Sequence, residues 1–171
     1  MTACTRLDPG TPVNVTHLEL RTLASDLVEQ ATTRISSEPL QRATDALLDA
    51  DGVIAVTPVY NGSFSGLFKL FFDALEEDAM KGRPVLIGAT GGTIRHSFVI
   101  DHVLVPLFFY LKAPVSPLGV YAATQDWGEP DSPLLDRIEK ASAEFAQLVV
   151  RSSPHKGPRG YDVTDFDLLR G

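Results

Sequence analysis

Two short apolar runs constrain the fold of this chain more than any other feature of its sequence. Residues 52–57 (GVIAVT) and 84–90 (PVLIGAT) are continuously apolar rather than alternating. Strands that are buried on both faces of a parallel sheet have this pattern, and parallel strands need long crossover connections between them. The sequence therefore predicts an α/β domain, with Pro58 expected to end the first of the two strands.

Helical patterns account for four segments around these strands. They cover residues 22–35, 40–50, 64–75 and 133–151. Ser37 and Pro39 are suited to begin the second of these helices, because serine caps helices and proline is tolerated in the first turn. Ser63 is placed to cap the third helix.

A fifth helix and two more strands complete the predicted pattern. The helix covers residues 94–112, where Thr93 is placed as the cap and Pro106 is expected to introduce a kink. Residues 13–20 (VNVTHLEL) alternate well enough to predict a strand, and residues 115–123 are expected to contain the last one.

Length and composition indicate one domain. The chain has 171 residues, and we interpret residues 1–151 as the domain and residues 152–171 as a tail that packs on it or on a partner subunit. The formal net charge of −7 argues against nucleic acid or an anionic membrane surface as a partner. Cys4, the single cysteine, has no partner for an internal disulfide, and we see no secretory leader, so a cytoplasmic location is expected.

Small polar residues follow both apolar runs. The first loop covers residues 57–63 (TPVYNGS) and the second covers residues 90–93 (TGGT). Open parallel sheets bind ligands beyond the carboxyl ends of their strands, and helix starts there offer unpaired backbone N–H groups. Either loop alone is typical of an ordinary strand-to-helix turn. Only the occurrence of both after consecutive buried strands favours a binding site.

The same segments resemble a known family. Residues 57–73 (TPVYNGSFSGLFKLFFD) are similar to the central signature of the NAD(P)H-dependent FMN reductases, which include the reductase partners of two-component, luciferase-like flavin monooxygenases. Residues 82–111 and 118–128 resemble the next two blocks of that family. The resemblance implies a flavodoxin-like, three-layer α/β/α fold with a parallel sheet in the order 2-1-3-4-5.

The resemblance also implies the cofactors, the partners and the site. FMN and NAD(P)H are the expected cofactors, and a homodimer or homotetramer built on residues 98–110 is the expected assembly. The flavin ring is expected to lie between two groups of residues: Pro58, Val59, Tyr60, Asn61, Gly62 and Ser63 on one side, and Thr90, Gly91, Gly92 and Thr93 on the other.

The cofactors are expected to carry the reaction themselves. Hydride passes from the nicotinamide to flavin N5, so the sequence is not expected to contain a catalytic acid–base pair. A metal site is not expected either. His96 and His102 are six residues apart on one predicted helix, which is not the spacing that places two side chains on the same face.

The match to the family is incomplete at the start of the chain. Members of the family begin with a strand, a loop that grips the FMN phosphate, and a helix, whereas residues 1–12 (MTACTRLDPGTP) resemble only the end of that helix. We therefore expect the first strand and the phosphate loop to be missing and FMN binding to be weak. A truncated chain or misassigned start is the simpler explanation. A second copy could instead fill the gap, or the edge strand could move inward.

Three functions follow from these observations. The leading hypothesis is an FMN reductase that supplies reduced FMN to a monooxygenase. The second is a quinone, azo or metal-ion reductase that keeps its FMN bound. The third, from another class, is a truncated and non-catalytic oligomerisation partner.

Overall fold

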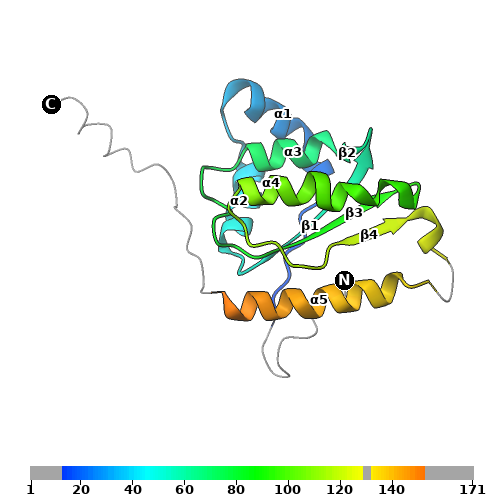
Figure 1. Ribbon diagram of the computed structural model, residues 1–171. Coiled ribbons are helices and arrows are strands. Elements are labelled where there is room, and N and C mark those ends of the chain that lie inside the picture. The colour runs from blue at the N-terminus through cyan, green and yellow to red at the C-terminus, as the bar shows by residue number, and fades with distance from the viewer. Residues whose placement is uncertain (1–12, 129–131, 153–171) are drawn as a thin grey trace.

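The computed structural model describes residues 13–128 and 132–152. They form three layers, with a four-stranded sheet between two layers of helices (Figure 1). The strands are β1 (Val53–Tyr60), β2 (Ser63–Phe64), β3 (Val85–Gly91) and β4 (Val120–Ala123), in the spatial order β2-β1-β3-β4. β1, β3 and β4 are parallel, and β2 is antiparallel to β1. The predicted α/β architecture is confirmed, and the two apolar runs form its two longest strands.

Five α-helices and several shorter helical turns connect and cover these strands in the described residues. The α-helices are α1 (Ala24–Thr33), α2 (Glu38–Asp49), α3 (Gly66–Asp73), α4 (Val105–Tyr110) and α5 (Leu134–Arg151). The 3-10 turns are η1 (Leu20–Leu23), η2 (Ile94–Phe98) and η4 (Thr124–Asp126), and η3 (Ile100–Leu104) is a π-helical segment. None of these helices is long and apolar enough to cross a membrane.

The larger core lies on the face of the sheet that α1 to α4 cover. Side chains of β1 and β3 on this face, Ala55, Val85, Ile87 and Ala89, belong to one apolar cluster with residues of all four helices. Aromatic rings join α3 to α4 within it, since the rings of Phe72 and Phe108 meet edge to face with centroids 5.0 Å apart.

The opposite face of the sheet is covered only in part. α5 packs there against β3 and β4, where Leu86 is buried with Phe145 of α5 (Figure 1). Ile54 and Val56 of β1 pair in register with Leu86 and Gly88 and so point to this same face, but they are 42% and 56% exposed. α5 therefore does not extend over β1.

The first part of β1 is also an open edge of the described sheet. The N–H of Val53 donates to the carbonyl of Pro84, so the alternation of the strand turns the peptide groups of Ile54 and Val56 away from β3. On that side the described strands supply only β2, which pairs with Val59 and Tyr60. Backbone groups that would normally be paired in a sheet thus face outward.

The predicted strand over residues 13–20 is wrong. Residues 13–19 have no regular secondary structure, and a 3-10 turn begins at Leu20. A strand requires a neighbour to satisfy its backbone groups, and none of the four described strands pairs with this segment. Its alternating sequence is therefore not sufficient to make it a strand.

The expectation that Pro58 ends the first strand is also wrong. β1 continues to Tyr60, and Pro58 pairs in register with Thr90. Pro58 shares the orientation of Ile54 and Val56, so its missing N–H would have pointed to the open edge rather than to β3. Proline is tolerated in a strand at such a position because no ladder hydrogen bond is lost.

Two helix starts follow the expected chemistry, one of them at a different residue. The hydroxyl of Ser37 accepts a hydrogen bond from the N–H of Leu40 at 3.3 Å, as predicted for the start of α2. α3 is capped by Ser65, whose hydroxyl accepts from the N–H of Phe68, and not by Ser63, which lies in β2. The strand therefore extends further, and α3 begins later, than the sequence indicated.

The long helix predicted over residues 94–112 is divided into three parts. Thr93 does cap its beginning, where its hydroxyl accepts from the N–H of Arg95 at 3.4 Å. A 3-10 turn and a π-helical segment precede α4, which contains Pro106 in its first turn. Proline cannot donate to the turn before it, and wider π-helical turns are a known way to accommodate such an interruption. Cys4 and the tail after Ser152 lie outside the described residues.

Candidate functional site

The two predicted loops lie side by side at one end of the sheet. The first begins in the last residues of β1 and ends at Ser63 in β2. The second begins in the last residues of β3, which is parallel to β1 and next to it. Pro58 at the start of the first loop pairs in register with Thr90 at the start of the second. The structure therefore brings the two groups of predicted site residues together at the carboxyl ends of the strands, where α/β sheets bind ligands.

The first loop is a β-hairpin. Tyr60 pairs with Ser63 across a two-residue turn of Asn61 and Gly62, whose φ angles are 49° and 77°. Two consecutive positive φ angles characterise a type I′ turn, and Asn-Gly is its preferred sequence. The dipeptide is the signal that could have predicted this hairpin from the sequence.

A buried hydroxyl at the base of the hairpin holds both of its ends. Thr57 is fully buried, and its hydroxyl donates to the carbonyl of Pro58 at 3.0 Å. The same oxygen accepts from the N–H of Ser65, also at 3.0 Å. Thr57 belongs to the predicted first loop, but this role was not predicted. The only signal for it is a hydroxyl at the end of an otherwise apolar strand.

The tip of the hairpin lies near the segment that follows the second loop. A Cβ built on Gly62 would lie 3.7 Å from the ring of Phe98 in η2. Tyr60 and Asn61 are exposed, and Gly62 and Ser63 are half-buried. A planar ligand can therefore reach the hairpin from solvent while one side of the hairpin is supported by the protein.

The second loop is anchored by a tyrosine from the next strand. The hydroxyl of Tyr121 in β4 donates to the carbonyl of Thr93 at 2.7 Å. Burial, followed by the nearby carboxylate of Asp126, raises the pKa of the Tyr121 hydroxyl above its ordinary value, so this group remains a donor. Gly92 is exposed, and a Cβ built on it would meet nothing within 4 Å. Open space therefore lies directly against the backbone of the loop.

An ion pair fixes the segment after β4. The carboxylate of Asp126 accepts from the N–H of Ala123 at 2.8 Å and pairs with the guanidinium of Arg137 in α5 at 2.9 Å. The backbone N–H of Ala123, and then Arg137, hold the pKa of Asp126 below its ordinary value. Arg137 also donates to the carbonyl of Tyr121 at 3.3 Å. β4 is thereby tied to α5 just beside the second loop.

Comparison with known proteins agrees with this arrangement. The profile of the family described as NADPH-dependent FMN reductase matches residues 3–128. The chain belongs to this family. The matched region contains both loops, all four strands and the helices on one face of the sheet.

Named members of the family cover most of this chain. An FMN reductase (NADPH) of Pseudomonas aeruginosa is 37% identical over 145 residues, which are 83% of this chain and 78% of that protein. The NADH-dependent FMN reductase SfnF of Pseudomonas fluorescens is 36% identical over 80% of this chain and 75% of its own length. The crystal structure of an oxidoreductase from Corynebacterium diphtheriae is 44% identical and superposes with a TM-score of 0.79 over 84% of this chain and 80% of that one.

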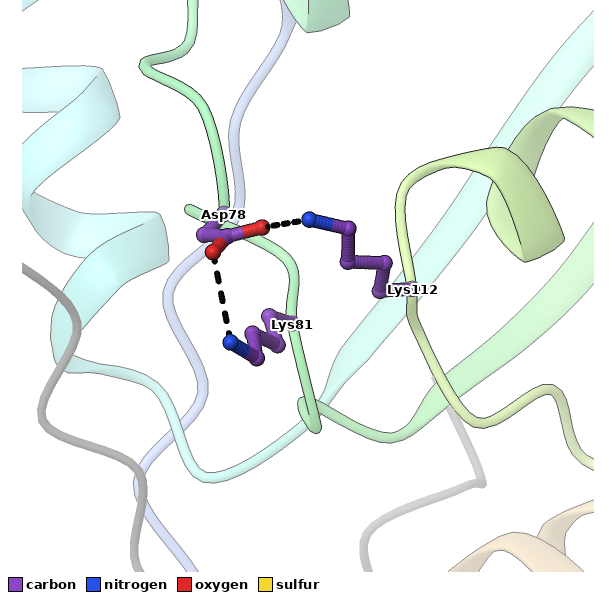
Figure 2. Close-up of polar contacts among 3 residues, drawn as sticks. All are labelled: Asp78, Lys81 and Lys112. Carbon is purple, nitrogen blue, oxygen red and sulfur yellow. Dashed lines mark hydrogen bonds and ion pairs between the residues drawn. The ribbon is translucent and has the colours of Figure 1, made fainter.

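The described residues contain no metal-binding cluster at this site, and a cluster of three charged side chains lies elsewhere. No group of three or more His, Cys, Asp or Glu residues in that part of the chain is arranged to hold a metal ion. A charged cluster at the opposite end of the sheet, just before β3, consists of Asp78, Lys81 and Lys112 (Figure 2). Its carboxylate binds both lysines and joins the segment before β3 to the end of α4, far from the carboxyl ends of the strands.

Proposed function

We propose that this chain is an NAD(P)H-dependent FMN reductase that transfers hydride from the nicotinamide to flavin N5. The observation that carries the proposal is the pair of adjacent loops at the carboxyl ends of β1 and β3, in a chain that belongs to the FMN reductase family. FMN, when bound, supplies the electron-accepting ring. The protein is left with binding the ring, orienting it and limiting the access of water.

The two loops suit a flat ring. We propose that the ring lies between the hairpin of residues 58–63 and the loop of residues 90–93, which are the residues that the sequence indicated. The open space against Gly92 fits a ring that lies against the backbone of the second loop. Backbone N–H groups of both loops are then suited to bind the carbonyl oxygens of the ring, and the reaction needs no acid–base pair from the protein.

The exposure of the loops supports a role in supplying reduced FMN to another enzyme. Tyr60 and Asn61 are exposed, so a ring at this hairpin remains close to solvent and is able to leave after reduction. We propose a flavin-dependent monooxygenase as the recipient and the cytoplasm as the location. Named relatives use NADPH in one case and NADH in the other, so both nicotinamides are to be tested.

We also propose that the chain forms a homodimer or homotetramer through the helical region that contains α4. Phe109 and Tyr110 are largely exposed at the end of α4, next to the buried Phe108. Exposed aromatic side chains are enriched at interfaces between subunits. Light scattering during gel filtration would show the assembly, and Phe109→Asp is expected to shift it toward the monomer.

Steady-state oxidation of NADPH and of NADH with added FMN tests the proposed activity. We expect FMN-dependent turnover, and Gly92→Val is expected to raise KM for FMN by about tenfold or more because the side chain fills the space beside the loop. Gly66→Ala is the matched control, since a Cβ there also meets nothing within 4 Å and the residue lies outside both loops. Absence of turnover with both nicotinamides would contradict the proposed activity, and flavin that stays bound through gel filtration would contradict the supply role.

A further inference from the structure

The side chain of Tyr121 lies directly against Gly91 of the second loop. Tyr121 is 6% exposed, and its hydroxyl donates to the carbonyl of Thr93 at 2.7 Å. A Cβ built on Gly91 would lie well under 3.0 Å from that same hydroxyl oxygen. Real Cβ atoms essentially never come so close to another atom, so a residue with a side chain at position 91 is incompatible with this hydroxyl where it lies.

The conflict at position 91 concerns the hydroxyl and not the ring. The same Cβ would lie 3.4 Å from Cζ of Tyr121 and 3.5 Å from Cβ of Val59, which are ordinary van der Waals distances. The φ angle of Gly91 is not among the positive ones, so alanine is not strained by the backbone there. Removal of a single oxygen atom would therefore make room for a methyl group at position 91.

We propose that Tyr121 is a positioning residue for the flavin, whose hydroxyl holds the Thr90–Thr93 loop in place and makes glycine necessary at position 91. This inference rests on the proposed function, because the ring is the ligand that the loop would be held for. The hydroxyl bonds to the last residue of the loop, and Gly91 gives it the space to do so. Tyr121 does not touch the reacting atoms in this role.

Contacts with α5 hold the strand that carries Tyr121. Arg137 of α5 donates to the carbonyl of Tyr121 and pairs with Asp126, whose carboxylate also accepts from the N–H of Ala123. β4 therefore cannot move away from α5 without breaking the two contacts that Arg137 makes. The hydroxyl of Tyr121 therefore donates to the neighbouring loop from a strand that is itself held by α5.

A double-mutant cycle with FMN binding as the readout tests this role. Gly91→Ala is expected to raise Kd for FMN by about tenfold or more, because the clash displaces the loop. Tyr121→Phe is expected to raise Kd by a smaller factor. The loop loses the hydrogen bond from the hydroxyl, but no side chain at position 91 displaces it. The double variant is expected to bind FMN more tightly than Gly91→Ala alone, and kcat at saturating FMN is expected to change less than KM.

Failure of that rescue would overturn the proposal. A double variant that binds FMN no better than Gly91→Ala would show that the methyl group meets the flavin or the backbone rather than the hydroxyl. An unchanged Kd in Tyr121→Phe would show that the anchor has no effect on the site. Tyr110→Phe is the matched control, since it keeps the exposed aromatic ring at the end of α4, removes only a hydroxyl outside both loops, and is expected to leave Kd unchanged.

Hydrogen exchange without FMN separates this inference from the proposed function. We expect the amides of residues 93–96 to exchange faster in Tyr121→Phe than in the wild-type chain and at an unchanged rate in Tyr110→Phe. Equal exchange in all three proteins would overturn the anchoring role whatever FMN does. Suppose instead that exchange is faster in Tyr121→Phe but the wild-type chain binds no FMN. The hydroxyl would then hold the loop, but its role in positioning the flavin and the proposed function would both be overturned.

Discussion

The N–H of Ser65 donates to the buried hydroxyl of Thr57 at 3.0 Å and so closes the base of the β1–β2 hairpin. The two residues are eight positions apart, and residues 58–63 lie between them. The same hydroxyl donates to the carbonyl of Pro58. One side chain therefore holds the beginning and the end of the loop that we propose lies along the flavin.

Replacing this hydroxyl by a methyl group is expected to destabilise the protein. Thr57→Val keeps the shape of the side chain but leaves the N–H of Ser65 without its partner, which costs about 1–3 kcal/mol in a buried setting. Thr57→Ser keeps the hydroxyl and is the matched control. Urea unfolding of the three proteins checks this, and equal losses of stability in the two variants would contradict the assigned role.

The hairpin also shows where prediction from the sequence reached its limit. The continuous apolar runs correctly predicted two buried parallel strands, and their carboxyl ends correctly located two adjacent loops. Pro58 was expected to end the strand because proline lacks an N–H, but that missing group points to the open edge. The Asn61-Gly62 dipeptide is a local signal for a hairpin turn. It was not used because Pro58 was assumed to end the strand before the turn.

The remaining differences come from contacts between distant parts of the chain. Residues 13–20 alternate like a strand, yet none of the described strands pairs with them, and pairing is not encoded in a single segment. The bond from Tyr121 to Thr93 spans 28 residues, and it depends on the register of β3 and β4. No local pattern in the sequence indicates such a contact.

Arg83 is expected to be the most costly charged residue to remove. It is fully buried, and its guanidinium donates to the carbonyls of Leu48 and Ala50, which end α2. Burial lowers the pKa of Arg83, and the carboxylates of Asp51 and Asp49 oppose that change.

Arg83→Ala would leave both carbonyls unpaired at a helix terminus, where a positive charge is favoured, at a cost of about 3 kcal/mol. Arg83→Lys is expected to recover only part of this stability, because an ammonium group does not present the planar fork of a guanidinium. Thermal unfolding of both variants measures the effect. A variant Arg83→Ala as stable as the wild type would contradict it.

Two isoleucines on neighbouring strands test whether one face of β1 is exposed to solvent. Ile87 in β3 is 1% exposed, whereas Ile54 in β1 is 42% exposed, on the face that α5 covers only over β3 and β4. Ile87→Ala is expected to cost about 2–5 kcal/mol, and Ile54→Ala clearly less. Chemical denaturation gives both values. A cost for Ile54→Ala equal to that for Ile87→Ala would show that another segment or a second copy covers this face.

The ion pair between Asp126 and Arg137 predicts a change of stability in acid. The pKa of Asp126 is held below its ordinary value of 3.8, so the folded protein gains stability from the carboxylate at pH values above that range. This contribution is lost as the pH falls through the pKa of the folded state. Asp126→Asn is therefore expected to lower Tm at neutral pH, and the difference from the wild type is expected to shrink below about pH 4. A difference in Tm that does not change with pH would contradict this.

Titration of FMN into the chain, followed by flavin fluorescence, tests the central claim most directly. If the hairpin of residues 58–63 and the loop of residues 90–93 hold the ring, fluorescence is expected to change in a saturable way with one binding site per chain. The same titration also measures how weak that binding is. Fluorescence that remains that of free FMN up to about 1 mM, the upper end of ordinary KM values, would contradict the claim that these two loops form a flavin site in this chain.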